Sequence, residues 1–170
     1  MGSSTAVFLA DAHARLARLS NVLHADATPQ AVAWTLCEFA GRELALVDCV
    51  VYLLDAGGRT LTQQAAWGPK RAADHVLESR LRLRLGQGIV GRSAQLRLPQ
   101  RTGDARRDER YVRDDQFNLS ELAVPIASDD TLHGVLDSEH PLANYYALED
   151  EHAMLAIAER GARRLRTLSG

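Results

Sequence analysis

The sequence predicts a single α+β domain, in which helices cover one face of an antiparallel sheet and a loop covers a pocket on the other. Three observations favour this class. They are an apolar run at residues 49–54, two alternating segments joined by a Ser/Asp-rich turn at 121–137, and helical apolar spacing near both ends. The order of elements is helix, helix, three strands, helix, polar loop, strand hairpin and helix. At 170 residues, the chain is long enough for one independent core.

Two helices are expected first. Over residues 5–24, apolar side chains recur at spacings of 3, 4, 3 and 4, which is typical of a helix that packs on another helix: Leu9, Ala12, Leu16, Leu19 and Leu23. Thr28 is placed to cap a second helix and Pro29 to open it, so this helix is expected from about residue 29 to 45. We therefore divide the chain into an N-terminal helix at residues 1–28 and a domain at residues 29–170.

Three strands and a short helix come next. The apolar run 49–54 predicts a central strand, and the turn at 55–58 leads into a strand from Thr60 to Trp67, with Leu61, Ala65 and Trp67 on one face. Residues 80–85 alternate arginine with leucine, which favours an exposed edge. A glycine turn then precedes a helix at about 89–95.

Residues 103–118 form a long, highly charged loop, and loops of this length are usually functional or mobile. Its aromatic residues, Tyr111 and Phe117, are candidate anchors of a lid. The alternative is a solvated loop held together by Arg–Asp pairs.

The hairpin after this loop sets the pairing of two acidic residues. With a turn at 128–130, we expect Ile126 to pair with Leu132, which places Glu121 directly opposite Asp137. Two facing carboxylates repel, so a cation, solvent or a bound proton must offset the repulsion. This pair is therefore a candidate ligand site, and a solvated sheet edge is the alternative.

The last helix is expected at residues 148–168, with acidic residues in its first turn and arginines near its end. Its apolar positions also repeat at spacings of 3 and 4: Leu155, Ala158, Ala162 and Leu165. Two terminal helices with such seams predict a homodimer formed through a shared helical bundle.

Composition excludes several classes of function. A net charge of −2 argues against nucleic-acid binding. Because no secretory segment or membrane-length apolar run is present, we expect a cytoplasmic protein whose Cys37 and Cys49 are buried and reduced. A metal site formed by His133, His140 and Asp137 is not favoured, since His133 and Asp137 lie four residues apart along one strand. The sequence identifies no cofactor.

An ordered set of motifs carries a family resemblance. They are LGQGIVG at 85–91, DERY at 108–111, SEL at 120–122, DSEHP at 137–141 and EDE at 149–151. Together they resemble a GAF domain, a small-molecule-sensing module related in fold to PAS domains, over about residues 30–164. The amino-acid sequence of these motifs is similar to that of a bacterial subgroup of GAF domains found at the N-termini of sensor histidine kinases and nucleotide cyclases.

The resemblance implies a GAF/PAS-like fold in which the charged loop closes a ligand pocket. It implies a regulatory domain that binds a small polar ligand and signals through its terminal helices to a histidine kinase or cyclase output domain. Glu121, Asp137 and Glu139 would accept hydrogen bonds from an amine or other donors of the ligand, and Trp67 and Tyr111 would form apolar walls.

Two alternatives remain open. Free methionine-(R)-sulfoxide reductases are GAF-like enzymes with acidic residues at positions that match Glu121, Asp137 and Glu139. Their cysteines have no counterpart in residues 88–92 or 116–119 of this chain, and sulfoxide reduction needs a thiolate. We therefore expect no such enzyme activity. The other alternative is a dimerisation module whose pocket is filled by its own side chains.

Overall fold

The computed structural model describes residues 2–78, 80–112 and 118–169, with side chains described from residue 11 onward. The helices are α1 (Gly2–Ala25), α2 (Pro29–Glu43), α3 (Gly88–Leu96) and α4 (Leu148–Ser169), with a 3-10 turn, η1 (Ala105–Arg107). The strands are β1 (Cys49–Leu54), β2 (Thr60–Trp67), β3 (Arg71–Ala73), β4 (Val76–Leu77), β5 (Arg82–Arg84), β6 (Gln100–Thr102), β7 (Ser120–Ser128) and β8 (Thr131–His140).

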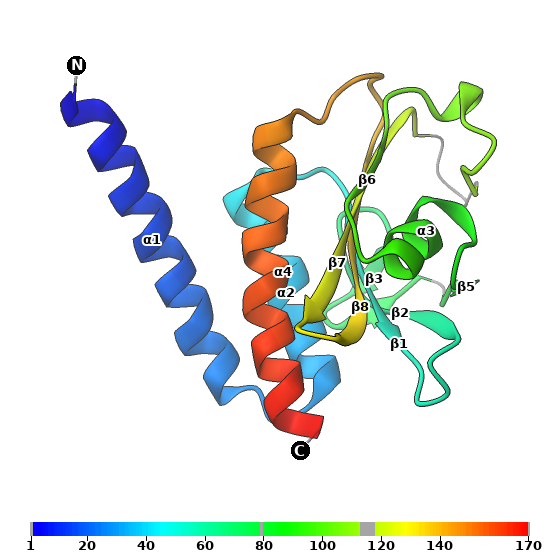
Figure 1. Ribbon diagram of the computed structural model, residues 1–170, viewed down its shortest axis with the longest axis horizontal. Coiled ribbons are helices and arrows are strands. Elements are labelled where there is room, and N and C mark those ends of the chain that lie inside the picture. Colours follow the sequence, from blue (N-terminus) through cyan, green and yellow to red (C-terminus); the bar gives the residue numbers. More distant parts are fainter. Residues whose placement is uncertain (1, 79, 113–117, 170) are drawn as a thin grey trace.

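Six strands form one antiparallel sheet in the order β5-β2-β1-β8-β7-β6, and β3 and β4 pair separately (Figure 1). The helices α1, α2 and α4 lie on one face of this sheet, and the short α3 lies on the other (Figure 1). The predicted α+β class is therefore confirmed. Each face of the sheet has its own apolar core, which we call the helix face and the pocket face.

Close contact between α2 and α4 organises the helix face. Leu36 of α2 is fully buried, and a Cβ added at Gly161 of α4 would lie 2.3 Å from its Cδ1 atom. Arg164 joins the same helix to the α1–α2 turn, since its Nε and Nη2 atoms donate hydrogen bonds of 3.0 and 2.7 Å to the carbonyl oxygen of Asp26. As predicted, Thr28 caps α2 and accepts a hydrogen bond from the backbone N–H of Ala31.

The leucine seam predicted for the first helix packs on its own chain. Leu19 and Leu23 are buried in the helix-face core, and Leu16 is partly buried against it. Ala158 and Ala162 of α4 are buried in the same core. From residue 11 onward, these seams are therefore occupied within the monomer, and this part of them does not by itself require a second chain. The N-terminal end of α1 stands away from the rest of the chain (Figure 1).

The hairpin register differs from the predicted one by two residues. Ile126 pairs with Gly134, and Glu121 faces Glu139 rather than Asp137, which pairs with Ala123. One residue of the shift comes from a tighter turn, because Ser128 pairs with Thr131 and leaves a two-residue loop in which Asp129 has a φ of 48°. The other comes from a bulge, because Ala127 pairs with Leu132 whereas Ile126 pairs with Gly134. A shift of two residues keeps every side chain on its expected face, so the three acidic residues still share one face.

The prediction for the faces of β2 was partly wrong. The pairing of β1 with β2 shifts between Val51 and Tyr52, which adds one residue on β2. As a result, Leu61 points to the pocket face, whereas Ala65 and Trp67 point to the helix face. The short strands β3, β4 and β6 were not predicted, since two or three residues carry too little periodicity.

Candidate functional site

Among the residues that the structure describes, four buried carboxyl groups meet on the pocket face of the sheet. Glu121 on β7 and Asp137 and Glu139 on β8 share this face, and Asp48 directly precedes β1, which pairs with β8. Their exposed fractions are 2–5%. Buried carboxylates are rare unless a cation, a proton or hydrogen bonds compensate them.

Lys70 supplies a cation to this cluster. Its ammonium group forms an ion pair with Glu139 Oε2 and lies 3.4 Å from Asp48 Oδ2. Burial alone would lower the pKa of Lys70, but attraction by Asp48 and Glu139 outweighs it and raises the pKa above its ordinary value. Lys70 is therefore charged, and it forms ion pairs with two of the four acidic residues, Asp48 and Glu139.

The charged loop contributes two further groups. The Tyr111 hydroxyl donates a 2.9 Å hydrogen bond to Glu139 Oε1, and Asn118 Nδ2 donates one of 3.3 Å to Glu139 Oε2. Away from the cluster, the loop is held by ion pairs of Arg106 with Asp104 and Arg110 with Asp108, both at 2.7 Å. The loop thus combines Arg–Asp pairs with contacts to the acidic cluster.

Glu121 on β7 and Asp137 on β8 are both buried on the pocket face of the sheet. Burial and the negative charges of Asp137 and Glu139 raise the pKa of Glu121 well above its ordinary value. Burial and Glu139 likewise raise the pKa of Asp137. Burial thus favours the protonated form of both carboxyl groups more than exposure to water would, which lessens the repulsion expected from the sequence.

A cavity of about 20 Å³ lies beside these groups, with room for about one water molecule. Its charged lining is Lys70, Glu121, Asp137 and Glu139, and its other lining residues are Tyr52, Leu81, Leu83, Gly88, Ile89, Val90 and Val112. Asp137 Oδ1 is buried and accepts no hydrogen bond from the described residues. The site thus has an acidic end with an unused acceptor and an apolar end.

The structure brings together four of the five predicted site residues: Tyr111, Glu121, Asp137 and Glu139. Trp67 lies apart, on the helix face, where its ring meets Gly41 and its Nε1 donates a 3.0 Å hydrogen bond to the carbonyl oxygen of Leu46. The bulge in β1–β2 pairing explains this placement. Phe117, the other predicted lid anchor, lies outside the described residues.

Sequence reasoning missed Lys70 and Asp48. Lys70 is the only lysine in a chain that has nineteen arginines, and it follows a Gly-Pro turn. Its rarity is a compositional signal that could have identified it. Asp48 immediately precedes a fully apolar strand, which predicted burial of its neighbours. Neither signal predicts that the two residues meet, because the contact depends on how the chain folds between them.

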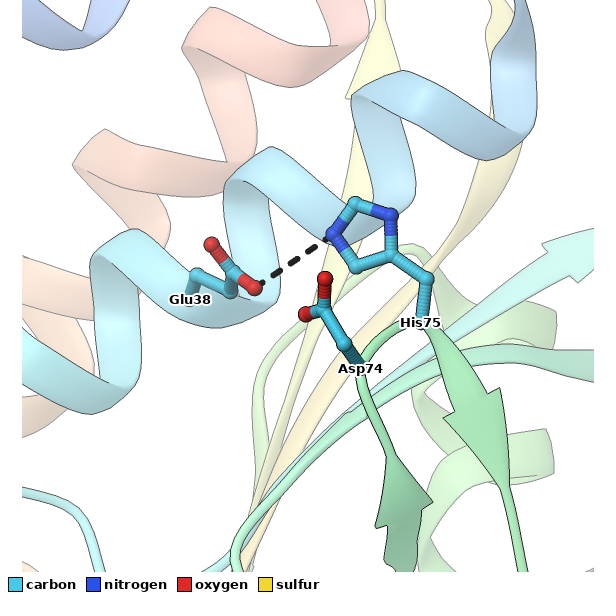
Figure 2. Close-up of side chains that lie close together, drawn as sticks. All are labelled: Glu38, Asp74 and His75. Atoms are coloured by element: carbon cyan, nitrogen blue, oxygen red, sulfur yellow. Dashed lines mark ion pairs between the residues drawn. The ribbon is translucent and has the colours of Figure 1, made fainter.

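A second cluster of potential metal ligands lies where the β3–β4 turn meets α2. Glu38, Asp74 and His75 have ligand atoms within 4.8 Å of one another, and His75 Nε2 lies 3.5 Å from Glu38 Oε1 (Figure 2). Arg71 forms ion pairs with both Glu38 and Asp74. Because a guanidinium already neutralises these carboxylates and Asp74 is 87% exposed, the cluster is an ion-pair contact between the turn and the helix.

The cysteines and histidines make contacts within the chain. Cys37 and Cys49 are both buried, and Cys37 Sγ donates a 3.1 Å hydrogen bond to the carbonyl oxygen of Cys49. His133 Nε2 lies 3.0 Å from Ser128 Oγ, and His140 Nδ1 accepts a hydrogen bond from the Leu142 N–H. In the described parts of the chain, no helix combines the length and apolar character needed to cross a membrane.

Comparisons with known proteins agree with this architecture. The family described as GAF domain matches residues 26–164. A free methionine-R-sulfoxide reductase from Neisseria meningitidis, solved in complex with its substrate, is 18% identical with a TM-score of 0.78, covering 99% of this chain and 95% of its own. A putative GAF sensor protein from Burkholderia vietnamiensis is 21% identical with a TM-score of 0.73, covering 93% and 95%.

The GAF domain of an Acinetobacter phosphoenolpyruvate-protein phosphotransferase is 17% identical with a TM-score of 0.74, covering 92% of this chain and 93% of its own. At these identities the similarity establishes the fold alone. A search of curated proteins by sequence gave no significant match.

Proposed function

The chain belongs to the GAF domain family, and we propose that it is a sensory or regulatory domain that binds a small polar ligand beside Tyr111, Glu121, Asp137 and Glu139. The observation that carries this proposal is the unused acceptor of Asp137. A buried carboxylate oxygen without a hydrogen-bond donor is costly to the folded state. Such an atom at the wall of a cavity is suited to a donor that arrives with a ligand.

The chemistry of the site favours a ligand with an ammonium group. Four acidic groups converge there, and each can accept hydrogen bonds from nitrogen donors. The apolar residues Leu83, Ile89 and Val112 would contact a short aliphatic part of the same ligand. The cavity of about 20 Å³ is too small for such a molecule, so binding requires movement of a wall.

We propose that the domain is not an enzyme. The acidic groups match those of the sulfoxide reductases, but the chain has only two cysteines, and both are buried in the helix-face core. We expect no thioredoxin- or dithiothreitol-dependent turnover of free methionine-(R)-sulfoxide. Turnover that is abolished by changing Cys37 or Cys49 would contradict this.

We propose dimerisation through the terminal helices, with α1 as the contacting element, and an output domain of the histidine kinase or cyclase type in the parent protein. The projecting N-terminal end of α1 supports the dimer (Figure 1).

Because Leu19 is buried within the chain, a Glu substitution there tests folding rather than assembly. Light scattering on a variant lacking residues 2–14 tests the dimer: the variant should be monomeric and remain folded. A wild-type chain that is monomeric at high micromolar concentration would contradict dimerisation.

Native mass spectrometry of freshly purified protein tests ligand binding. The wild type should retain a small molecule, and denaturation should release a compound that contains an amine. The matched control is the double variant Glu121→Gln, Asp137→Asn, which keeps the size of both side chains and should retain less of the compound. An occupied double variant, or a wild type that neither retains nor binds any amine from a panel of amino acids and small amines, would contradict the proposal.

A further inference from the structure

The hairpin β3–β4 carries two adjacent cations that face different parts of the molecule. Its strands pair with each other and not with the six-stranded sheet. Successive residues of an extended chain point to opposite sides. Lys70, just before β3, therefore contacts Asp48 and Glu139, while Arg71 contacts Glu38 on α2 at 2.9 Å and lies 5.5 Å from the Trp34 ring.

Lys70 uses the carboxylates that an ammonium ligand would need. Its side chain brings a primary ammonium group to the acidic end of the cavity, and Glu139 accepts an ion pair from it. This is the same functional group that the proposed function assigns to the ligand. Only about 20 Å³ of space remains, so the site is closed while Lys70 is in it.

We propose that Lys70 is a tethered occupant of the binding site, and that a ligand bearing a primary ammonium group displaces it. This inference rests on the proposed function, since it assumes that the acidic cluster binds a cation. Displacement exchanges one ammonium for another, so the buried carboxylates remain compensated throughout. The competing route is opening of the Tyr111 loop, which would admit a ligand while Lys70 stays in place.

Displacement also changes the contact with α2. Lys70 and Arg71 are neighbours, so movement of Lys70 out of the pocket alters the position from which Arg71 reaches Glu38. The stack of His75 on Trp34, with ring centroids 4.7 Å apart, lies at the other end of the same hairpin. The hairpin thus connects occupation of the pocket to the surface of α2.

Chemical rescue tests the proposal. Lys70→Ala removes three carbons and one nitrogen, the atoms of n-propylammonium, which is the probe. At ten times its dissociation constant, the probe should raise the melting temperature of Lys70→Ala by about 3–6 °C. The wild type should bind it at least about tenfold more weakly, which is a smaller shift at the same concentration. Neutral n-propanol, at matched ionic strength, should have no effect.

The outcomes separate this inference from the proposed function. If the wild type binds n-propylammonium as tightly as Lys70→Ala does, the acidic cluster is a cation site but Lys70 is not its competitor, and the inference is overturned. If folded Lys70→Ala does not respond, the cluster does not bind an ammonium group and the proposed function fails as well. Lys70→Met, which fills the space without charge, should fold but show no rescue.

A second measurement needs no variant. Lys70 is the only lysine, so acetylation of its amine can be followed by mass spectrometry, with the N-terminal amine as the internal control. The probe is n-propylguanidinium, a cation that the reagent does not consume. Its saturating addition should accelerate acetylation of Lys70 several-fold and leave the N-terminal rate unchanged. An unchanged Lys70 rate at saturation, judged from the plateau of the melting temperature, would overturn the inference.

Discussion

The two faces of the sheet bury side chains of opposite polarity. On the helix face, Leu36, Leu122 and Leu136 are fully buried among apolar residues of α2 and α4. On the pocket face, Glu121 and Asp137 are nearly as buried, but burial raises the pKa of both carboxyl groups, and the nearby charge of Lys70 opposes this rise. Burial therefore has different consequences on the two faces: it stabilises the helix face, and it makes the stability of the pocket face depend on pH and on a cation.

Removing a large side chain from the helix face should have the largest effect. Leu36→Ala should lower the free energy of unfolding by about 3 kcal/mol, because it removes buried methyl groups and leaves a cavity beside Gly161. The melting temperature should fall by about 6–12 °C. The control is Val22→Ala, which is 54% exposed and should change stability by less than about 0.5 kcal/mol. Equal effects of the two changes would contradict the described core.

Neutralising the pocket face should have the opposite sign. Without ligand, Glu121→Gln with Asp137→Asn should hold or raise stability by up to about 1 kcal/mol, since it removes two buried acids at nearly constant volume. Thermal denaturation at neutral pH measures this. A loss of several degrees would show that Lys70 depends on these charges for its position, and that the acids are structural.

The stability of the pocket face should depend on pH, whereas that of the helix face should not. The pKa values of Glu121 and Asp137 are raised from ordinary values of 4.5 and 3.8, so the folded state holds more protons than the unfolded state above these values. Their contribution to stability is therefore full below about pH 4 and is lost as the pH rises toward their folded pKa values. Between pH 5 and 8, the melting temperature of the wild type should fall relative to that of the double Gln/Asn variant. Parallel curves would contradict raised pKa values for Glu121 and Asp137.

The smallest effect is expected in the charged loop. Arg110 lowers the pKa of Asp108 to about 2, so the stability from this pair is present above the ordinary value of 3.8 and is lost as the pH falls toward 2. Because the Arg110 side chain is 43% exposed, Asp108→Asn should cost less than about 1 kcal/mol at neutral pH. Denaturant titration at pH 7 and at pH 3 should show the difference shrinking at the lower pH.

Most of the fold could be predicted because long elements carry periodic signals. The bounds of β1 and β2 agree with the sequence, and α3 and α4 agree within one residue. The errors arose where a turn or a bulge changes which residues of two neighbouring strands pair. A two-residue turn and a bulge in β8 together moved Glu121 opposite Glu139, and one extra residue in β2 moved Trp67 to the helix face. Neither a bulge nor a turn type leaves a periodic pattern in the sequence.

The acidic half of the site could also be predicted, because alternation along two paired strands fixes which face each carboxylate takes. The position of the cation, Lys70, could not be predicted. Lys70 reaches Glu139 across 69 positions of sequence, and it does so from a hairpin too short to be identified by pattern. Contacts of this kind depend on tertiary structure, and residue spacing contains no information about them.

The two hydrogen bonds from Arg164 to Asp26 give the terminal helices a common fixed point at one end. From that point α1 extends for 24 residues, a length of about 36 Å. A change of about 5° in its angle to α4 would therefore move its far end by about 3 Å. A rotation of α1 too small to detect within the domain would therefore be measurable as a change in distance at its N-terminal end.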